Sequence, residues 1–81
     1  MAKPSPSHAG NPVLAALGEA IRRARIEAGV SQEKLALDAG IDRSYMGGIE
    51  RGEHNVAIIN LVKIATALGV RLSELLERSG H

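Results

Sequence analysis

Apolar residues recur every three or four positions along most of the chain, which is the spacing of amphipathic helices. The first such segment starts at Asn11 and Pro12, because asparagine favours the N-cap and proline tolerates the first helical position. Gly29 marks its end, and Ser31 is placed to cap the next helix. The apolar stripe of the first helix is expected to comprise Leu14, Leu17, Ile21, Ala24 and Ala28.

Residues 32–51 predict two short helices joined by a tight turn at Gly40, in the manner of a helix-turn-helix. Asp42 is placed to cap the second of these helices. The small side chains of Ala36 and Ala39 would let the second helix cross closely over the first. The residues of the second helix that need no core partner predict a polar face narrow enough to enter a groove: Asp42, Arg43, Ser44, Tyr45, Gly47 and Gly48.

Two further helices are expected over residues 58–68 and 72–78. The apolar residues of 58–68 are spread too widely for a helix with one solvated side, so this helix is expected to be central. No segment alternates with a period of two, so strands are not expected. The sequence therefore predicts an all-α fold, with a compact five-helix domain at residues 12–78 between a flexible arm (1–11) and a short tail (79–81).

The composition argues against several classes of protein. The 81 residues contain no cysteine, so disulfides and thiolate metal sites are excluded and a reducing cytoplasm is the expected location. The net charge of +1 argues against coating nucleic acid by bulk charge, so any anion binding must be local. No apolar run approaches the roughly 18 residues of a membrane span, and no signal peptide is apparent. With three scattered histidines and no carboxylate cluster, we expect no enzyme, metal, cofactor or small-molecule substrate.

About residues 13–77 resemble the Cro/repressor class of bacterial helix-turn-helix regulators, also called XRE or lambda-repressor-like. The resemblance rests on a basic first helix, SQEKLA opening the second helix, AGIDRS across the turn, YMGGIERG in the third helix, and LVKIATALGV leading to LSELL. Several such marks in one order are more specific than a lone helix-turn-helix pattern. The resemblance implies a regulator that inserts a recognition helix, about residues 42–51, into the major groove of double-stranded DNA.

The resemblance also implies which residues orient the recognition helix and which residues read DNA bases. Arg25 and Glu50 match a pair that ties the first helix to the end of the recognition helix, although an exposed ion pair of little effect is the alternative. Arg43 and Ser44 match the principal base-reading positions, with Asp42 beside them. Arginine can donate a bidentate pair to guanine, whereas a phosphate contact or a solvated side chain is the alternative for Arg43. Asp42 is expected to cap the helix rather than to read bases.

Phosphate contacts are expected around the same face. The resemblance assigns them to Ser31, Gln32, Tyr45, Arg51, His54 and Asn55. The resemblance also implies that Gln32 braces the recognition helix, and the alternative is a plain polar residue at a helix N-terminus, which suits a phosphate whatever its side chain. Partial burial in the core is the alternative for Tyr45. The arm carries Lys3 and His8 and could lie against the DNA backbone or be an untethered terminus.

A homodimer on a pseudo-palindromic operator is the expected assembly, because one recognition helix reads too few base pairs. Its interface is assigned to Val70, Leu72, Leu75 and Leu76, unless these residues close the core of the monomer. The alternative function is that of an antitoxin or anti-regulator whose main partner is another protein. The resemblance leaves three settings open: a phage-type repressor, a controller of a restriction-modification operon, and a stand-alone operon regulator.

Overall fold

The computed structural model describes residues 10–81, so residues 1–9 of the predicted arm, with Lys3 and His8, lie outside the described residues. Within residues 10–81 the fold is all-α. Its five helices follow the predicted order: α1 (Pro12–Glu27), α2 (Gln32–Ala39), α3 (Arg43–Glu50), α4 (Ile58–Leu68) and α5 (Leu72–Arg78). The predicted five-helix fold is therefore confirmed.

The ends of the helices follow local signals in the sequence. The side-chain oxygen of Asn11 accepts a hydrogen bond from the backbone N–H of Val13 at 2.9 Å, so Asn11 is the N-cap of α1 and not part of the arm. Ser31 caps α2 by accepting from the N–H of Lys34 at 3.0 Å. Gly40 ends α2 with φ of 68°, a left-handed conformation that favours glycine.

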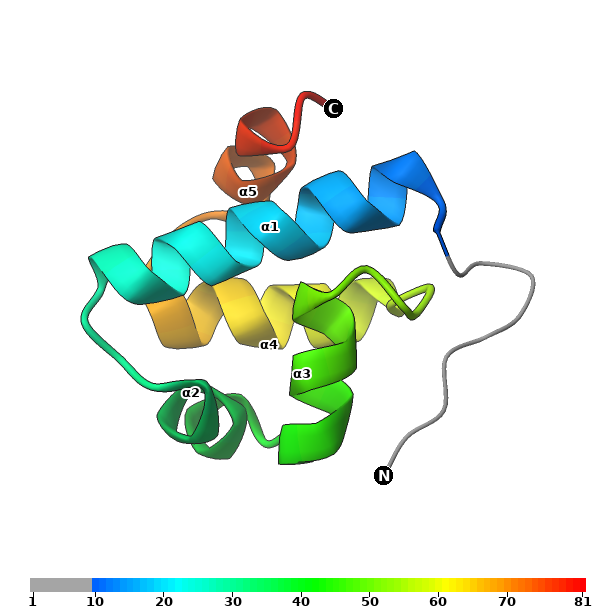
Figure 1. Cartoon of the computed structure of the whole chain (residues 1–81). Coiled ribbons are helices and arrows are strands. Elements are labelled where there is room, and N and C mark those ends of the chain that lie inside the picture. The colour runs from blue at the N-terminus through cyan, green and yellow to red at the C-terminus, as the bar shows by residue number, and fades with distance from the viewer. Residues whose placement is uncertain (1–9) are drawn as a thin grey trace.

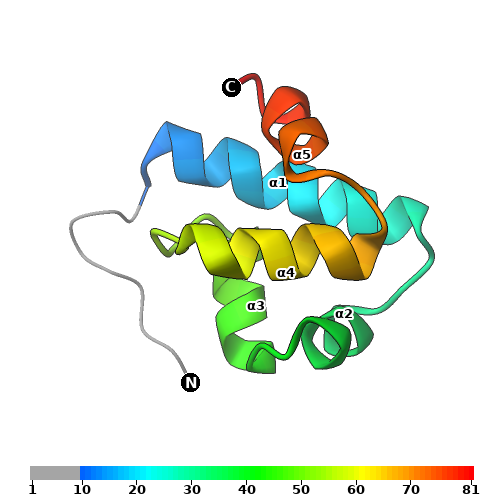
Figure 2. The same cartoon turned by 180° about the vertical axis from the view of Figure 1, so that it is seen from behind.

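The helices pack in layers around one core. Figures 1 and 2 show α1 and α4 side by side across the middle of the molecule, with α5 on one side and α2 and α3 on the other. All five helices contribute buried residues to the core: Leu17, Ile21, Ala24, Leu35, Ala36, Ala39, Met46, Ile49, Leu61, Ile64, Ala65 and Leu75. Gly18 lets the end of α3 approach α1, because a Cβ there would lie 2.7 Å from the carbonyl oxygen of Glu50.

α4 lies across the middle of the molecule (Figure 1), but it has a solvated face that its wide set of apolar residues did not predict. One face is buried, but Ile58, Ile59 and Val62 are 61%, 63% and 46% exposed. We call these three residues the α4 surface. The neighbouring helices α1, α2 and α5 cover only the opposite face, and no described element packs over the α4 surface. Ala28, which the sequence placed in the stripe of α1, lies beyond the end of that helix and is exposed.

Candidate nucleic-acid interface

α2 and α3 form the predicted helix-turn-helix. The backbone N–H of Ile41 donates to the carbonyl of Ala36 at 2.9 Å and closes the turn after α2. Asp42 then starts α3, since its side chain accepts from the N–H of Tyr45 at 3.1 Å. Ala36 and Ala39 are buried in the core, where their small side chains allow the two helices to approach closely. The structure thus confirms that Asp42 caps α3, as expected from the sequence.

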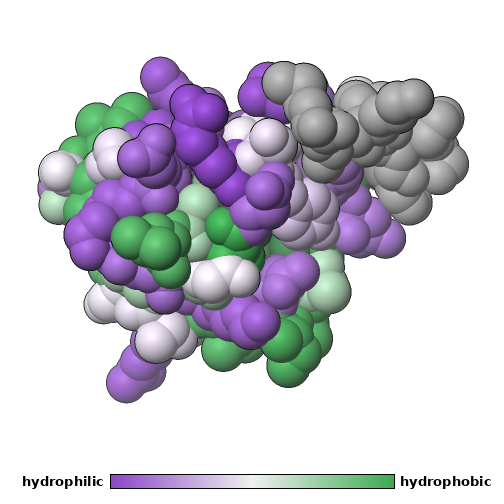
Figure 3. Space-filling view, turned by 90° about the horizontal axis from the view of Figure 1, so that it is seen from below, coloured by the Kyte–Doolittle hydropathy of each residue, from purple (hydrophilic) through white to green (hydrophobic). Residues whose placement is uncertain are grey.

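The N-terminal end of α3 is polar and accessible. Arg43 is exposed, and none of the ion pairs within residues 10–81 includes its guanidinium. Ser44 and Tyr45 follow and are half-buried. Figure 3 views the molecule from the side of α2 and α3, and hydrophilic atoms cover much of this face. The guanidinium of Arg43 can therefore donate to an external acceptor without first breaking an internal ion pair.

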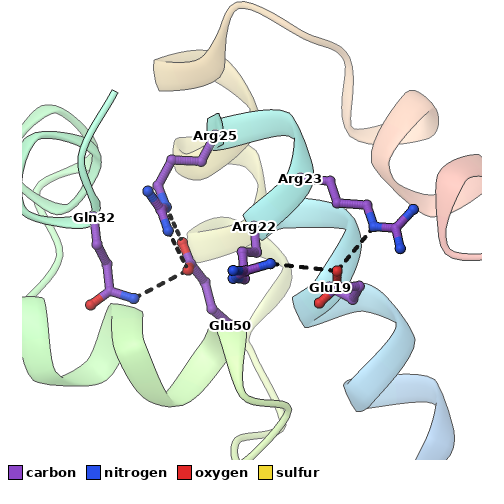
Figure 4. A network of polar contacts seen from close by, with 6 residues as sticks. All are labelled: Glu19, Arg22, Arg23, Arg25, Gln32 and Glu50. Carbon is purple, nitrogen blue, oxygen red and sulfur yellow. Dashed lines mark hydrogen bonds and ion pairs between the residues drawn. The ribbon is translucent and has the colours of Figure 1, made fainter. Parts of the chain in front are cut away.

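A buried ion pair joins α1 to the end of α3. Arg25 donates from Nε to one carboxylate oxygen of Glu50 at 2.7 Å and from Nη2 to the other at 3.1 Å (Figure 4). Its Nη1 also donates to the carbonyl of Val30 at 3.1 Å, which fixes the connection between α1 and α2. The Arg25 and Glu50 side chains are only 14% and 3% exposed, so the alternative of an exposed pair is excluded.

Gln32 extends this network to α2. Its amide nitrogen donates to Glu50 Oε1 at 3.1 Å, so three helices meet at one carboxylate (Figure 4). The resemblance implied that Gln32 both touches phosphate and braces the recognition helix, and in the structure its amide nitrogen braces the end of α3. The first backbone N–H groups of α2, beside the exposed Ser31, remain at the helix N-terminus where anions bind well.

Figure 4 also shows an ion-pair cluster that is exposed to solvent, unlike the buried Arg25–Glu50 pair. On α1, Glu19 accepts from Arg23 Nε at 2.9 Å and lies 3.7 Å from Arg22 Nη1 (Figure 4). The Arg23 and Glu19 side chains are 71% and 46% exposed. Exposed pairs of this kind typically contribute less than about 1 kcal/mol. The contrast makes burial, rather than the number of ion pairs, the distinguishing property of the Arg25–Glu50 link.

The loop after α3 contains a second, exposed ion pair. Arg51 donates to both carboxylate oxygens of Glu53, at 2.8 and 3.1 Å. This hydrogen bonding raises the pKa of Arg51 and lowers the pKa of Glu53. The positive charge of Arg51, which the sequence assigned to a phosphate, is therefore partly balanced within the protein. Asn55, assigned to the same backbone, is exposed.

His54 departs from its predicted role. The sequence assigned it to a phosphate, but the residue is only 8% exposed and its Nε2 is buried without a hydrogen-bond partner in the described structure. Its ring lies against Tyr45, with the ring centroids 4.8 Å apart and the planes tilted by 48°. As placed here, Nε2 cannot reach a phosphate. The burial depends on how the loop folds back over α3, for which residues 51–57 carry no local signal.

Gly47 and Gly48 are buried in the middle of α3, and packed side chains explain both. A Cβ on Gly47 would lie 3.1 Å from Nη1 of Arg51 and 3.3 Å from Oε1 of Gln32. A Cβ on Gly48 would overlap Nε2 of His54 and lie 2.5 Å from its Cδ2. The glycines thus make room for side chains from α2 and from the loop, which sequence reasoning did not identify.

The predicted dimer residues divide into two groups. Leu75 is completely buried in the monomer core, so its assignment to an interface is wrong. Val70, Leu72 and Leu76 are half-buried and pack against the core while keeping part of their surface. The exposed apolar residues that the sequence missed are those of the α4 surface. Their signal was present, because the apolar set on that helix is wider than one buried face requires.

The described part of the chain offers hydrogen-bonding and charged groups on this face. Within residues 10–81, no three side chains of His, Cys, Asp or Glu lie close enough together to hold a metal ion. None of the helices in that range has both the length and the apolar character needed to cross a membrane.

Comparison with known proteins identifies similar chains. A helix-turn-helix family model matches residues 21–75. Control protein C.BamHI of Bacillus amyloliquefaciens is 40% identical over 68 residues, which cover 83% of this chain and 84% of the relative. Control protein C.MunI of a Mycoplasma species is 39% identical over 66 residues, covering 80% and 89%. The crystal structure of the restriction-modification controller protein C.AhdI from Aeromonas hydrophila is 48% identical with a TM-score of 0.75, covering 76% of this chain and 94% of that chain.

Proposed function

From the premise that this chain belongs to the helix-turn-helix family of DNA-binding transcriptional regulators, we propose that it reads a pseudo-palindromic operator as a homodimer, with α3 in the major groove. One observation carries this proposal. Arg43 stands exposed at the start of α3, outside every ion pair of residues 10–81, while buried hydrogen bonds hold the other end of that helix. A reading side chain is thereby presented on a rigid support.

In the proposed complex, base reading is concentrated in Arg43. Its guanidinium can donate a bidentate pair to guanine O6 and N7, which discriminates against other bases by about 1–3 kcal/mol. Ser44 supplies a short donor and acceptor of weaker preference. The carboxylate of Asp42 is engaged in capping α3, so we assign it no base contact. Gly48 has no side chain with which to read.

Phosphate contacts position the reading helix in this proposal. The N–H groups at the start of α2, with the exposed Ser31, face one strand, and Tyr45, Arg51 and Asn55 face the backbone near α3. Gln32 acts indirectly, because its amide nitrogen is bonded to Glu50. The buried network of Arg25, Gln32 and Glu50 sets the angle between the phosphate-binding end of α2 and the base-reading end of α3.

We propose that the dimer forms through the α4 surface. Three large apolar side chains, each about half exposed or more, stand together on one helix and have no covering element among the described residues. A two-fold contact places the same surface of both subunits together, so an apolar helix face can pair with itself. A stable interface buries roughly 800 Å² per partner, more than three side chains supply. The proposed interface therefore extends towards α5, where Val70, Leu72 and Leu76 keep part of their surface.

We further propose that the regulated unit is a restriction-modification operon. Several of the similar proteins are named as control proteins or restriction-modification controllers, and they match most of their own length. The short described fold carries no separate sensory region within residues 10–81, which suits control by the concentration of the protein.

Selection of bound sequences from random DNA tests the reading proposal. A symmetric motif with half-sites about one helical turn apart is expected. Replacing Arg43 by Ala should remove the preference at one base pair per half-site. Arg23→Ala is the matched control, because Arg23 is an exposed arginine of α1 that belongs neither to the proposed DNA contacts nor to the proposed interface. An unchanged motif for the Arg43 variant would exclude Arg43 as a base-reading residue.

Sedimentation equilibrium tests the proposed interface. Val62→Glu and Ile59→Glu should shift the protein from dimer to monomer, since each places a charge in an apolar contact. Ile26→Glu is the control, because Ile26 is an apolar residue of α1, 51% exposed, and lies outside the α4 surface. Dimers that persist in both α4 variants would assign the interface elsewhere, and a stoichiometric second protein in the native preparation would favour a protein-directed role.

A further inference from the structure

His54 combines three properties that the proposed DNA contacts do not use. It is 8% exposed, its Nε2 is buried, and that nitrogen has no hydrogen-bond partner among the described residues. Burying a polar atom without a partner carries a desolvation cost, so packing elsewhere must compensate for it. The residues that pack around the imidazole therefore indicate what it does.

Gly48 forms one wall of the His54 site. A Cβ on Gly48 would overlap Nε2 of His54, so the imidazole occupies the space into which a side chain at position 48 would project. The backbone also joins the two segments, since the N–H of Glu53 donates to the carbonyl of Gly48 at 2.9 Å. The loop after α3 is thus held against the recognition helix on the flank that carries Gly48.

Tyr45 forms another wall of the site. The Tyr45 and His54 ring centroids are 4.8 Å apart, and Tyr45 lies three residues before Gly48 on the same side of α3. No hydrogen bond within residues 10–81 fixes the Tyr45 hydroxyl, so the packing of its ring, against the core on one side and against His54 on another, restrains its direction. The imidazole therefore contributes to the position of the hydroxyl.

We infer that His54 is a positioning residue for Tyr45: its imidazole fills the gap left by Gly48 and directs the Tyr45 hydroxyl towards the DNA backbone. This inference rests on the proposed phosphate contact of Tyr45. It differs from the role that the sequence assigned to His54, since the imidazole acts through a second side chain and touches no phosphate. Gly48 and His54 consequently form a coupled pair, in which a larger residue at one position requires a smaller residue at the other.

Thermal unfolding of four proteins tests the packing: wild type, Gly48→Ala, His54→Ala and the double variant. Gly48→Ala alone should lower Tm, because the new methyl group meets the imidazole. In the His54→Ala background the same change should leave Tm unchanged or raise it, because the space is empty and alanine favours the helix. An equal decrease in both backgrounds, or none in the wild type, would reject the gap-filling role.

DNA binding tests the positioning, using a second cycle with Tyr45→Phe. In the wild type, loss of the hydroxyl should weaken operator binding by about tenfold per subunit, the value of one hydrogen bond to a charged group. In the His54→Ala background Tyr45→Phe should have little further effect. An equal loss in both backgrounds, including no loss in either, would overturn the inference. If His54→Ala is too unstable to bind, His54→Gln serves instead, since it keeps a polar group but removes the ring.

The salt dependence of binding separates the two roles of His54. Positioning a neutral hydroxyl releases no counterion, so His54→Ala should leave the slope of log K against log salt unchanged, whereas loss of a charged phosphate contact reduces the slope by about one per subunit. A reduced slope would mean that His54 itself contacts a phosphate, and it would contradict the positioning role. If the wild type binds no DNA, the proposed function fails, and the unfolding cycle still reports on the Gly48 and His54 packing.

Discussion

Removal of Arg25 is the most direct perturbation of the buried link between α1 and α3. The carboxylate of Glu50 accepts three hydrogen bonds, two from Arg25 and one from Gln32. In Arg25→Ala the Gln32 bond remains, and the carboxylate, 3% exposed, is left without its countercharge. The variant therefore measures the cost of an unpaired buried charge together with the loss of the two hydrogen bonds that hold the end of α3 against α1.

The expected effect is large for a domain of this size. Breaking a buried pair on one side costs about 3–5 kcal/mol, against a total stability of about 5–15 kcal/mol for a typical domain. For domains of 60–100 residues, each kcal/mol lowers Tm by about 4–8 °C, so Tm should fall by at least about 12 °C. Glu50→Gln in the same variant removes the unpaired charge and should recover part of this loss.

Circular dichroism at 222 nm is the appropriate assay, because the chain is helical and has a single tyrosine and no tryptophan. Arg23→Ala is the matched control, since it breaks the exposed pair with Glu19 on the same helix and should cost less than about 1 kcal/mol. Operator affinity should fall for the Arg25 variant and stay unchanged for the control. Equal Tm values for the two variants would refute the reasoning that burial gives the Arg25 link its strength.

Other substitutions address the remaining features of the interface. Asp42→Ala should cost about 1 kcal/mol by removing the cap of α3, whereas Asp42→Asn should cost less; equal losses in urea unfolding would argue against capping. Glu53→Gln should strengthen DNA binding and steepen its salt slope by about one per subunit, because Arg51 becomes available to phosphate; an unchanged slope would place Arg51 away from the DNA. The pKa of Glu53 is lowered by its hydrogen bond from Arg51, so the pair stabilises the fold above the unfolded pKa and loses this effect as the pH falls through the folded pKa. Titration by NMR should show a higher pKa in Arg51→Ala, and no increase would contradict the pairing. Gly52→Ala should cost more than about 2 kcal/mol, since φ is 76° and a Cβ would lie 2.6 Å from the α1 backbone, whereas Gly69→Ala, with φ of 74° and open space, should cost less; equal Tm decreases would exclude the contact with α1.

The secondary structure could be predicted because its signals are local. Asn11, Ser31 and Asp42 each cap a helix through a backbone N–H only two or three residues away, and Gly40 ends α2 through its own φ angle. Such signals act within one helical turn, so they operate wherever the segment packs. The family resemblance added the link between Arg25 and Glu50, which are 25 residues apart and carry no local signal for their meeting.

The burial of individual side chains could not be predicted from such local signals, because it depends on which helices and loops pack together. Leu75 and Ile59 are both apolar residues at helical spacing, yet one is completely buried and the other is 63% exposed. His54 reads as a polar loop residue until the chain after α3 folds back and the missing side chain of Gly48 leaves a gap for its ring. Contacts between segments far apart in sequence are set by the packing of whole helices, so the burial of His54 and Leu75 and the exposure of the α4 surface emerged only from the assembled fold.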